Sequence, residues 1–145
     1  MSDDLRNTID ILAKVIASIG VLIVVLNYRN QVRIKRAEWL KSLFEKFFEN
    51  QLYKEARGWL DYDELGEKLS INNDLEKRNN EEKFTDFLNF FEFIGVLHFR
   101  GELTMKEVNE VFDYYLKKIK NEENCRVWIN KYGFEKLNKL LLKTG

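Results

Sequence analysis

The pattern of apolar and polar positions changes sharply near the start of the chain. Residues 9–26 are mostly apolar, and a basic cluster follows at once, consisting of Arg29, Arg33, Lys35 and Arg36. An apolar helix of about 20 residues can cross the hydrocarbon core of a bilayer. Short segments rich in Lys and Arg stay on its cytoplasmic side. This order predicts one transmembrane helix at the cell membrane, with the rest of the chain in the cytoplasm.

Charged residues interrupt the first turns of this apolar segment. Asp10 and Lys14 leave only residues 15–26 free of charge, and a run of that length is also typical of a buried core helix or a signal peptide. Two features favour the membrane. Asp10 and Lys14 are four residues apart, so they can pair on one helix face. The basic cluster follows the apolar core, whereas a signal peptide carries its positive charge before it.

Asp10, Lys14 and Ser18 recur at every fourth residue and form a polar strip along one face of the predicted helix. Polar groups inside a membrane usually face other helices or water. Ala17 and Gly20 lie nearby and are small enough to allow close helix packing. The strip therefore favours self-association into a homo-oligomer. The alternative is that Asp10 and Lys14 mark the water boundary and that Ser18 is tolerated.

The rest of the chain follows the periodicity of helices. Apolar residues recur at helical spacing over residues 39–48 and again over residues 52–60. Residues 66–80 are polar and predict a loop. Four further helices are expected, over residues 81–99, 104–120, 125–132 and 134–143. The first ends before Gly101 and the third ends at Gly133. The second begins with a capping box of Thr104 and Glu107.

These patterns predict an all-α protein. Residues 1–34 are expected to hold the transmembrane helix and the basic cluster, and this helix continues into a cytoplasmic helical bundle over residues 35–145. The chain contains no proline, which agrees with long helices, and its 11 phenylalanines supply a core. The expected core includes Phe44, Phe47, Leu88, Phe91, Val111, Leu116 and Trp128.

Few residues in this sequence can carry chemistry. The chain contains one histidine and one cysteine, which excludes an internal disulfide framework and a zinc site built from these residue types in one chain. No glycine-rich phosphate loop and no nucleophile elbow occurs in the sequence. We therefore expect no catalytic residue, no metal and no cofactor, and we do not expect an enzyme.

The charge is balanced, with 24 basic and 24 acidic residues, but it is uneven along the chain. We call the cluster of Arg29, Arg33, Lys35 and Arg36 the basic collar; membrane topology and anionic lipid headgroups explain it. Nucleic-acid binding is disfavoured, because no basic face with interleaved aromatic residues accompanies the collar. The expected partners are the lipid bilayer and further copies of the chain, and a cytoplasmic protein is a further candidate.

Three polar residues fall among aromatic residues in the predicted helices: Arg57, Asn89 and Glu92. A buried carboxylate can act in proton chemistry when its pKa is raised. However, the sequence identifies no partner base, nucleophile or metal for Glu92. The favoured interpretation is structural. Asn89 and Glu92 satisfy backbone groups or Arg57 inside the bundle, because buried charges are normally paired.

One stretch of the chain resembles a bacterial protein family of unknown function: DFLNFFEFIGVLHFR at residues 86–100, followed by GELT and by VFDYYL at residues 111–116. Members are small and helical and often carry one N-terminal membrane helix, so the resemblance implies this fold and topology. A more distant likeness, by architecture alone, is to the membrane-pore accessory protein of type VI-B CRISPR systems, whose helical body is related to the HEPN nuclease fold. No Arg stands about five residues before His98, so the HEPN nuclease motif is missing.

Two classes of function remain. The first is a membrane-anchored, self-associating helical protein that acts through the bilayer as a pore or, by architectural analogy, as an effector of antiviral defence. The second is a tethered binding module that recruits a cytoplasmic protein or RNA. They differ in whether an unrelated hydrophobic helix can replace the membrane helix, since only a tether tolerates that change.

Overall fold

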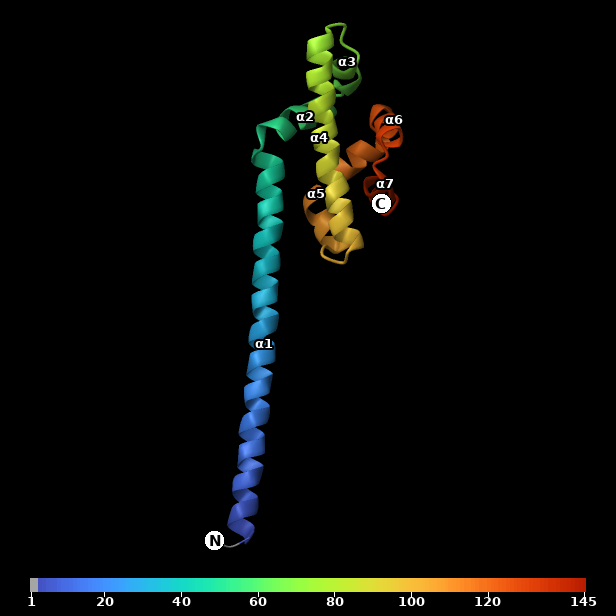
Figure 1. Cartoon of the computed structure of the whole chain (residues 1–145). Helices are drawn as coiled ribbons and strands as arrows, with labels where there is room; N and C mark the ends of the chain where they lie inside the picture. Colours follow the sequence, from blue (N-terminus) through green and yellow to red (C-terminus); the bar gives the residue numbers. More distant parts are fainter. Residues whose placement is uncertain (1–2) are drawn as a thin grey trace. The chain divides into compact units, whose positions relative to one another are not determined.

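The computed structural model describes the backbone of residues 3–145 and the side chains of residues 12, 14 and 16–145. Every regular element of this part of the chain is an α-helix, which confirms the predicted all-α class. The chain divides into two compact units, Met1–Leu43 and Phe44–Gly145. Helix α1 (Asp3–Glu49) runs through the boundary between them, and Figure 1 shows the helices in chain order.

The first unit consists of helix α1 as far as Leu43. Its side chains from Ile16 to Lys35 are exposed. Among the described residues, no helix combines the length and the apolar character that a membrane crossing requires. The side chains of residues 9–11, where the predicted span begins and where Asp10 stands, lie outside the described ones.

A corner between two helices opens the second unit. Helix α1 ends at Glu49, and the side chain of Asn50 accepts a hydrogen bond from the N–H of Leu52, which makes Asn50 the N-cap of α2 (Gln51–Asp61). Arg57 reaches back and donates from Nη2 to the carbonyl of Phe48 at 2.9 Å. This carbonyl lies in the last turn of α1, where carbonyls lack helical partners. The corner is thus held from both sides.

The predicted loop over residues 66–80 is wrong for most of its length. Helix α3 (Leu65–Leu69) occupies its start, and α4 (Asp74–Phe99) begins well before residue 81. The side chain of Asn73 accepts two backbone N–H groups of the first turn of α4. Two acidic residues in that turn suit the positive end of the helix dipole. Most of these polar residues lie on helices that face the solvent. Their polarity reflects this exposure, and the prediction of a loop misread it.

The last three helices are α5 (Met105–Asn121), α6 (Glu123–Tyr132) and α7 (Glu135–Leu141). The predicted capping box is confirmed, since Thr104 and Glu107 satisfy each other's backbone N–H groups at the start of α5. The predicted stop of α6 is also confirmed. Gly133 adopts a left-handed conformation with φ of 75°, which glycine accepts without a steric penalty.

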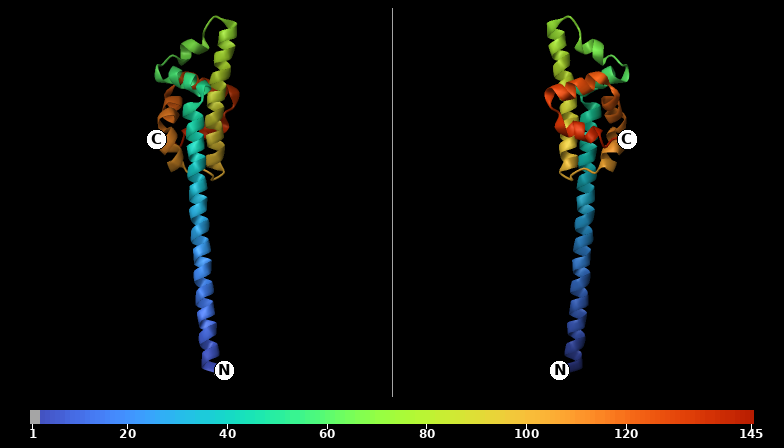
Figure 2. Two further views of the ribbon diagram at one scale, coloured as in Figure 1. Left: turned by 90° about the vertical axis from the view of Figure 1, so that its left-hand side faces the viewer. Right: turned by 90° about the vertical axis from the view of Figure 1, so that its right-hand side faces the viewer.

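Helix α4 is the centre of the second unit. Helices α2, α3, α5 and α7 all lie against it. Figure 1 shows α3 beside the first turns of α4 and α5 beside its last turns. Figure 2 shows the same helices from two further sides, with α7 in red close to α4. Segments from both ends of the second unit therefore meet on one helix.

A cluster of aromatic rings forms the core around α4. Phe47 is fully buried, and its ring centroid lies 4.9 to 6.1 Å from those of its neighbours. Many of these contacts are edge-to-face, the arrangement that aromatic quadrupoles favour. The neighbours are Phe48, Tyr53, Phe87, Phe90, Phe91, Phe112 and Tyr115.

Most of the predicted core is confirmed: Phe47, Leu88, Phe91, Leu116 and Trp128 are buried. Phe44 is 46% exposed, and Val111 is only half-buried, so these two predictions are wrong. Both errors are errors of helical phase. The buried face of α5 is formed by Val108, Phe112, Leu116 and Ile119, and Val111 lies beside this face.

Candidate functional site

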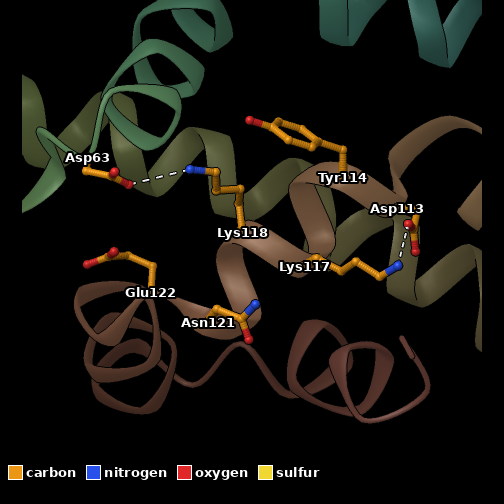
Figure 3. A pocket seen from close by; sticks show the side chains of 7 residues that line it. All are labelled: Asp63, Asp113, Tyr114, Lys117, Lys118, Asn121 and Glu122. Carbon is orange, nitrogen blue, oxygen red and sulfur yellow. Dashed lines mark hydrogen bonds and ion pairs between the residues drawn. The ribbon is translucent and has the colours of Figure 1, made fainter.

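A cleft of about 490 Å³ opens on the second unit beside α5, and we call it the α5 cleft. All of its lining residues but one belong to α5 or directly follow it. The exception, Asp63, stands in the turn after α2 with φ of 56°, a left-handed conformation that Asp tolerates better than most residues. Figure 3 shows the lining side chains: Asp63, Asp113, Tyr114, Lys117, Lys118, Asn121 and Glu122.

The lysines of the α5 cleft pair with carboxylates beside them. Lys118 Nζ lies 3.4 Å from Asp63 Oδ1 and donates to the carbonyl of Leu60 at 3.2 Å. Lys117 Nζ lies 2.8 Å from Asp113 Oδ2, and Figure 3 shows the two lysines reaching in opposite directions. Exposed pairs of this kind contribute about 0–1 kcal/mol each. They set the local charge pattern and add little to stability.

Two neighbouring tyrosines of α5 hold the end of α2. Tyr114 Oη donates to Asp61 Oδ1 at 2.9 Å, and Tyr115 Oη donates to Asp61 Oδ2 at 3.1 Å. Burial, followed by the charge of Asp61, raises the pKa of Tyr115 to about 12. The hydrogen bond to Asp61 is the main cause that raises the pKa of Tyr114. Both phenols stay protonated at neutral pH, so they position α2 against α5 and offer no activated nucleophile.

Titration of the phenols checks this arrangement. Because the folded pKa of Tyr115 lies above the usual tyrosine value of about 10, its contribution to stability is complete below pH 10. It is lost as the pH rises from about 10 to about 12. Tyr115→Phe is expected to remove the last step of phenolate absorbance and to flatten the fall of stability over this window. Tyr28→Phe, in the first unit, is the control. If both variants lost the last step of phenolate absorbance, its assignment to Tyr115 would be contradicted.

The predicted polar residues of the core take different positions. Arg57 is buried, as predicted, and its guanidinium lies over the rings of Phe47 and Phe48, 5.1 and 4.9 Å from their centroids. Asn89 is exposed, so the prediction that it is buried is wrong. It lies on the outer face of α4, between the buried residues Leu88 and Phe90.

Glu92 is half-buried and binds the backbone of α7. Its two carboxylate oxygens accept hydrogen bonds from the N–H groups of Lys136, at 3.0 Å, and Leu137, at 2.7 Å. These groups belong to the first turn of α7, where N–H groups lack helical partners and a negative charge is favoured. The prediction that Glu92 satisfies backbone groups is therefore confirmed. It has the structural role of a cap supplied from another helix.

Two further polar side chains are paired near helix ends, and sequence reasoning missed the first of them, Asn80. Asn80 is buried and donates from Nδ2 to the carbonyl of Lys68 at 3.0 Å, at the end of α3. His98 places Nδ1 3.0 Å from the carbonyl of Leu103 and Nε2 3.2 Å from Lys143 Nζ. Both side chains satisfy groups near helix ends, and neither faces the α5 cleft.

The polar strip and the basic collar lie on α1. Lys14 and Ser18 are exposed, and Ser18 Oγ donates to the carbonyl of Lys14 at 2.8 Å, so this hydroxyl has a partner within its own helix. The pairing of Lys14 with Asp10 stays a prediction, because the side chain of Asp10 is outside the described ones. In the collar, Arg36 is half-buried, and the exposed members are Arg29, Arg33 and Lys35.

The α5 cleft is polar, since it combines paired charges with one protonated phenol, that of Tyr114. The single cysteine, Cys125, is buried, and burial raises the pKa of its thiol. In the part of the chain that the structure describes, no group of His, Cys, Asp and Glu residues could hold a metal ion. Comparisons of the chain with protein families, with curated proteins and with solved structures found no match.

Proposed function

We propose that this protein is a membrane-anchored, self-associating helical protein, with α1 crossing the bilayer and the second unit in the cytoplasm. The exposed apolar surface of α1 carries the proposal. Residues 21–26 are all apolar, and each is between 47% and 67% exposed. Successive residues of an α-helix point about 100° apart, so six in a row leave no polar face. Such a surface needs apolar surroundings on every side.

A bilayer fits this surface better than a protein partner does. A docked helix or a coiled coil needs only an apolar stripe and keeps a polar face toward water. A helix that is apolar all round belongs in a large core or in a membrane. The basic collar directly follows the apolar segment and favours a cytoplasmic second unit.

Self-association is supported by the polar strip and by Gly20. Lys14 and Ser18 are exposed on one face of α1, and inside a bilayer such a face favours contact with other helices or water. Apart from the backbone of its own helix turn, no described atom lies within 4 Å of the position that a Cβ of Gly20 would take. A second helix therefore has room to approach closely at this point.

Charges placed in the apolar surface are expected to release the protein from membranes. Leu22→Arg combined with Val25→Arg adds two guanidinium groups to the segment, and each costs about 2.5–3.5 kcal/mol at the centre of an inserted helix. We expect the wild-type protein to stay in the membrane pellet after an alkaline carbonate wash. The double variant is expected in the supernatant. Cell fractionation followed by immunoblotting measures the distribution.

A matched control keeps the added charge and changes its place. Leu75 and Leu142 are 81% and 79% exposed in the second unit, so Leu75→Arg combined with Leu142→Arg is expected to remain in the pellet. A wild-type protein found in the soluble fraction of unwashed cells would overturn the membrane anchor. A reporter fused after Gly145 that reads out as external would overturn the proposed orientation.

The tethered binding module is a second candidate, because the α5 cleft offers an open surface of mixed charge. The two functions differ in the mass of the purified full-length protein in detergent. A self-associating protein sediments as an oligomer, and Lys14→Leu combined with Ser18→Leu is expected to change its size. A monomer in both samples would overturn self-association and leave the tethered module in its place.

A further inference from the structure

A second cleft, of about 350 Å³, opens on the second unit, and we call it the α4 groove. It shares no lining residue with the α5 cleft. Three helices contribute to its walls. The lining residues are Lys46 from α1, Leu52 and Tyr53 from α2, and Asp86, Asn89, Phe90 and Phe93 from α4.

The α4 groove combines exposed apolar surface with available charge. Two apolar side chains contribute the exposed surface: Leu52 on α2 is 44% exposed, and Phe93 on α4 is 47% exposed. Lys46 and Asp86 form no hydrogen bond or ion pair with another described residue. Burial and the nearby carboxylate of Asp86 raise the pKa of Tyr53, which keeps its phenol neutral. The groove thus presents one cation and one anion around an apolar centre.

We propose that the α4 groove is the surface through which the second units of two copies associate as a two-fold pair. The proposal rests on the proposed self-association and names its cytoplasmic surface. In a two-fold interface, every contact between a residue of one copy and a residue of the other is repeated in reverse. Lys46 of each copy pairs with Asp86 of the other copy, and the apolar surfaces of Leu52 and Phe93 cover one another.

The charges of the groove favour a second copy over a different partner. Lys46 and Asp86 stand on different helices, α1 and α4. An occupant that satisfies both must present an anion and a cation around an apolar surface, and the groove itself has this composition. An acidic partner or a basic partner would leave one of the two charges facing apolar surface without a counter-ion.

Membrane anchoring makes a small surface sufficient for association. A stable protein interface in solution buries about 1,200–2,000 Å², which is more than a cleft of this size suggests. When two copies are already held together through α1, the second contact becomes intramolecular, and its effective concentration reaches the millimolar range. The groove then adds register and specificity to an association that the anchor begins.

Charge exchange tests the reciprocal pair. Lys46→Glu and Asp86→Lys each place like charges opposite one another twice per dimer, and each is expected to weaken association of the full-length protein at least tenfold. The double variant restores opposite charges and is expected to recover the wild-type level. Energy transfer between donor-labelled and acceptor-labelled copies in lipid vesicles measures the association. Both positions are exposed, and thermal unfolding checks that each variant keeps its fold.

Cross-linking gives an independent readout. Lys46→Cys and Asp86→Cys, made in separate copies and co-expressed, are expected to yield a mixed disulfide dimer in oxidised membranes. The native Cys125 is buried and gives no background. The control uses Tyr132→Cys in place of Asp86→Cys. Tyr132 lies on α6 and is 48% exposed, and this combination is expected to give no mixed disulfide dimer.

The outcomes separate this proposal from the proposed function. Single exchanges that leave energy transfer unchanged overturn the groove contact, while association of the wild type leaves self-association standing. Weakening that the double exchange does not restore overturns the reciprocal pair. A wild-type protein that shows no energy transfer overturns self-association itself, and with it the groove contact.

Discussion

Replacing Phe47 with alanine is expected to lower the free energy of unfolding of the second unit by about 3–5 kcal/mol. Phe47 is fully buried, and its ring is packed by aromatic residues from α1, α2, α4 and α5. Removing it leaves a cavity where these four helices meet. A domain is typically stable by about 5–15 kcal/mol, so the loss is a large fraction of the total. Urea unfolding followed by tryptophan fluorescence measures it.

Phe44→Ala is the matched control for this change. Phe44 lies one turn earlier on the same helix, is 46% exposed, and contacts the ring of Phe48 at a centroid distance of 4.4 Å. Because 46% of its surface stays exposed to water in the folded protein, whereas Phe47 is fully buried, the expected loss is smaller than that of Phe47→Ala. Equal losses for Phe44→Ala and Phe47→Ala would show that the helical phase of α1 is wrong.

Gly95→Ala is expected to destabilise the second unit by about 1–3 kcal/mol. A Cβ at this position of α4 would lie 2.8 Å from both the carbonyl carbon and the carbonyl oxygen of Lys136. These are backbone atoms of α7, so no flexible side chain can move aside. Glu92, one turn earlier, accepts hydrogen bonds from the same turn of α7. The substitution should therefore loosen α7, which faster tryptic cleavage near Lys136 and Lys139 would report.

Gly58→Ala is expected to change stability in the opposite direction. Gly58 lies inside α2, and apart from the backbone of its own helix turn no described atom is within 4 Å of the position that a Cβ would take. Alanine restricts the unfolded chain more than glycine does and favours the helix, which stabilises by about 0.4–1 kcal/mol. Thermal unfolding of the two variants side by side measures the difference. A gain in stability for Gly95→Ala would refute the close approach of α4 and α7.

Local signals made parts of the fold predictable from sequence. The capping box of Thr104 and Glu107 and the glycine stop at Gly133 depend only on residues a few positions apart. The region over residues 66–80 was missed because polarity alone does not distinguish a loop from a solvated helix. Asn73 caps α4 with its side chain, but asparagine is also common in turns, so it did not mark the start of a helix in the sequence.

The polar sites depend on contacts that the sequence does not encode locally. Arg57 and Glu92 were recognisable as polar residues among aromatic ones. The groups that Glu92 binds lie 44 and 45 residues further along the chain. Tyr114 and Asp61 are 53 residues apart, and no spacing rule connects them. The sequence signalled this contact only by the pair of adjacent tyrosines, of which Tyr114 is exposed and Tyr115 is half-buried.

The docking of α7 against Glu92 and Gly95 has a consequence for how the protein is made. The ribosome synthesises the chain from its N-terminus, so α7 emerges after helices α1 to α6. Until α7 arrives, the face of α4 that it covers stays open to solvent, and the buried leucines of α7, Leu137, Leu140 and Leu141, have no partner. Closure of the second unit therefore waits until α7 has been synthesised, after every other helix of the unit has left the ribosome.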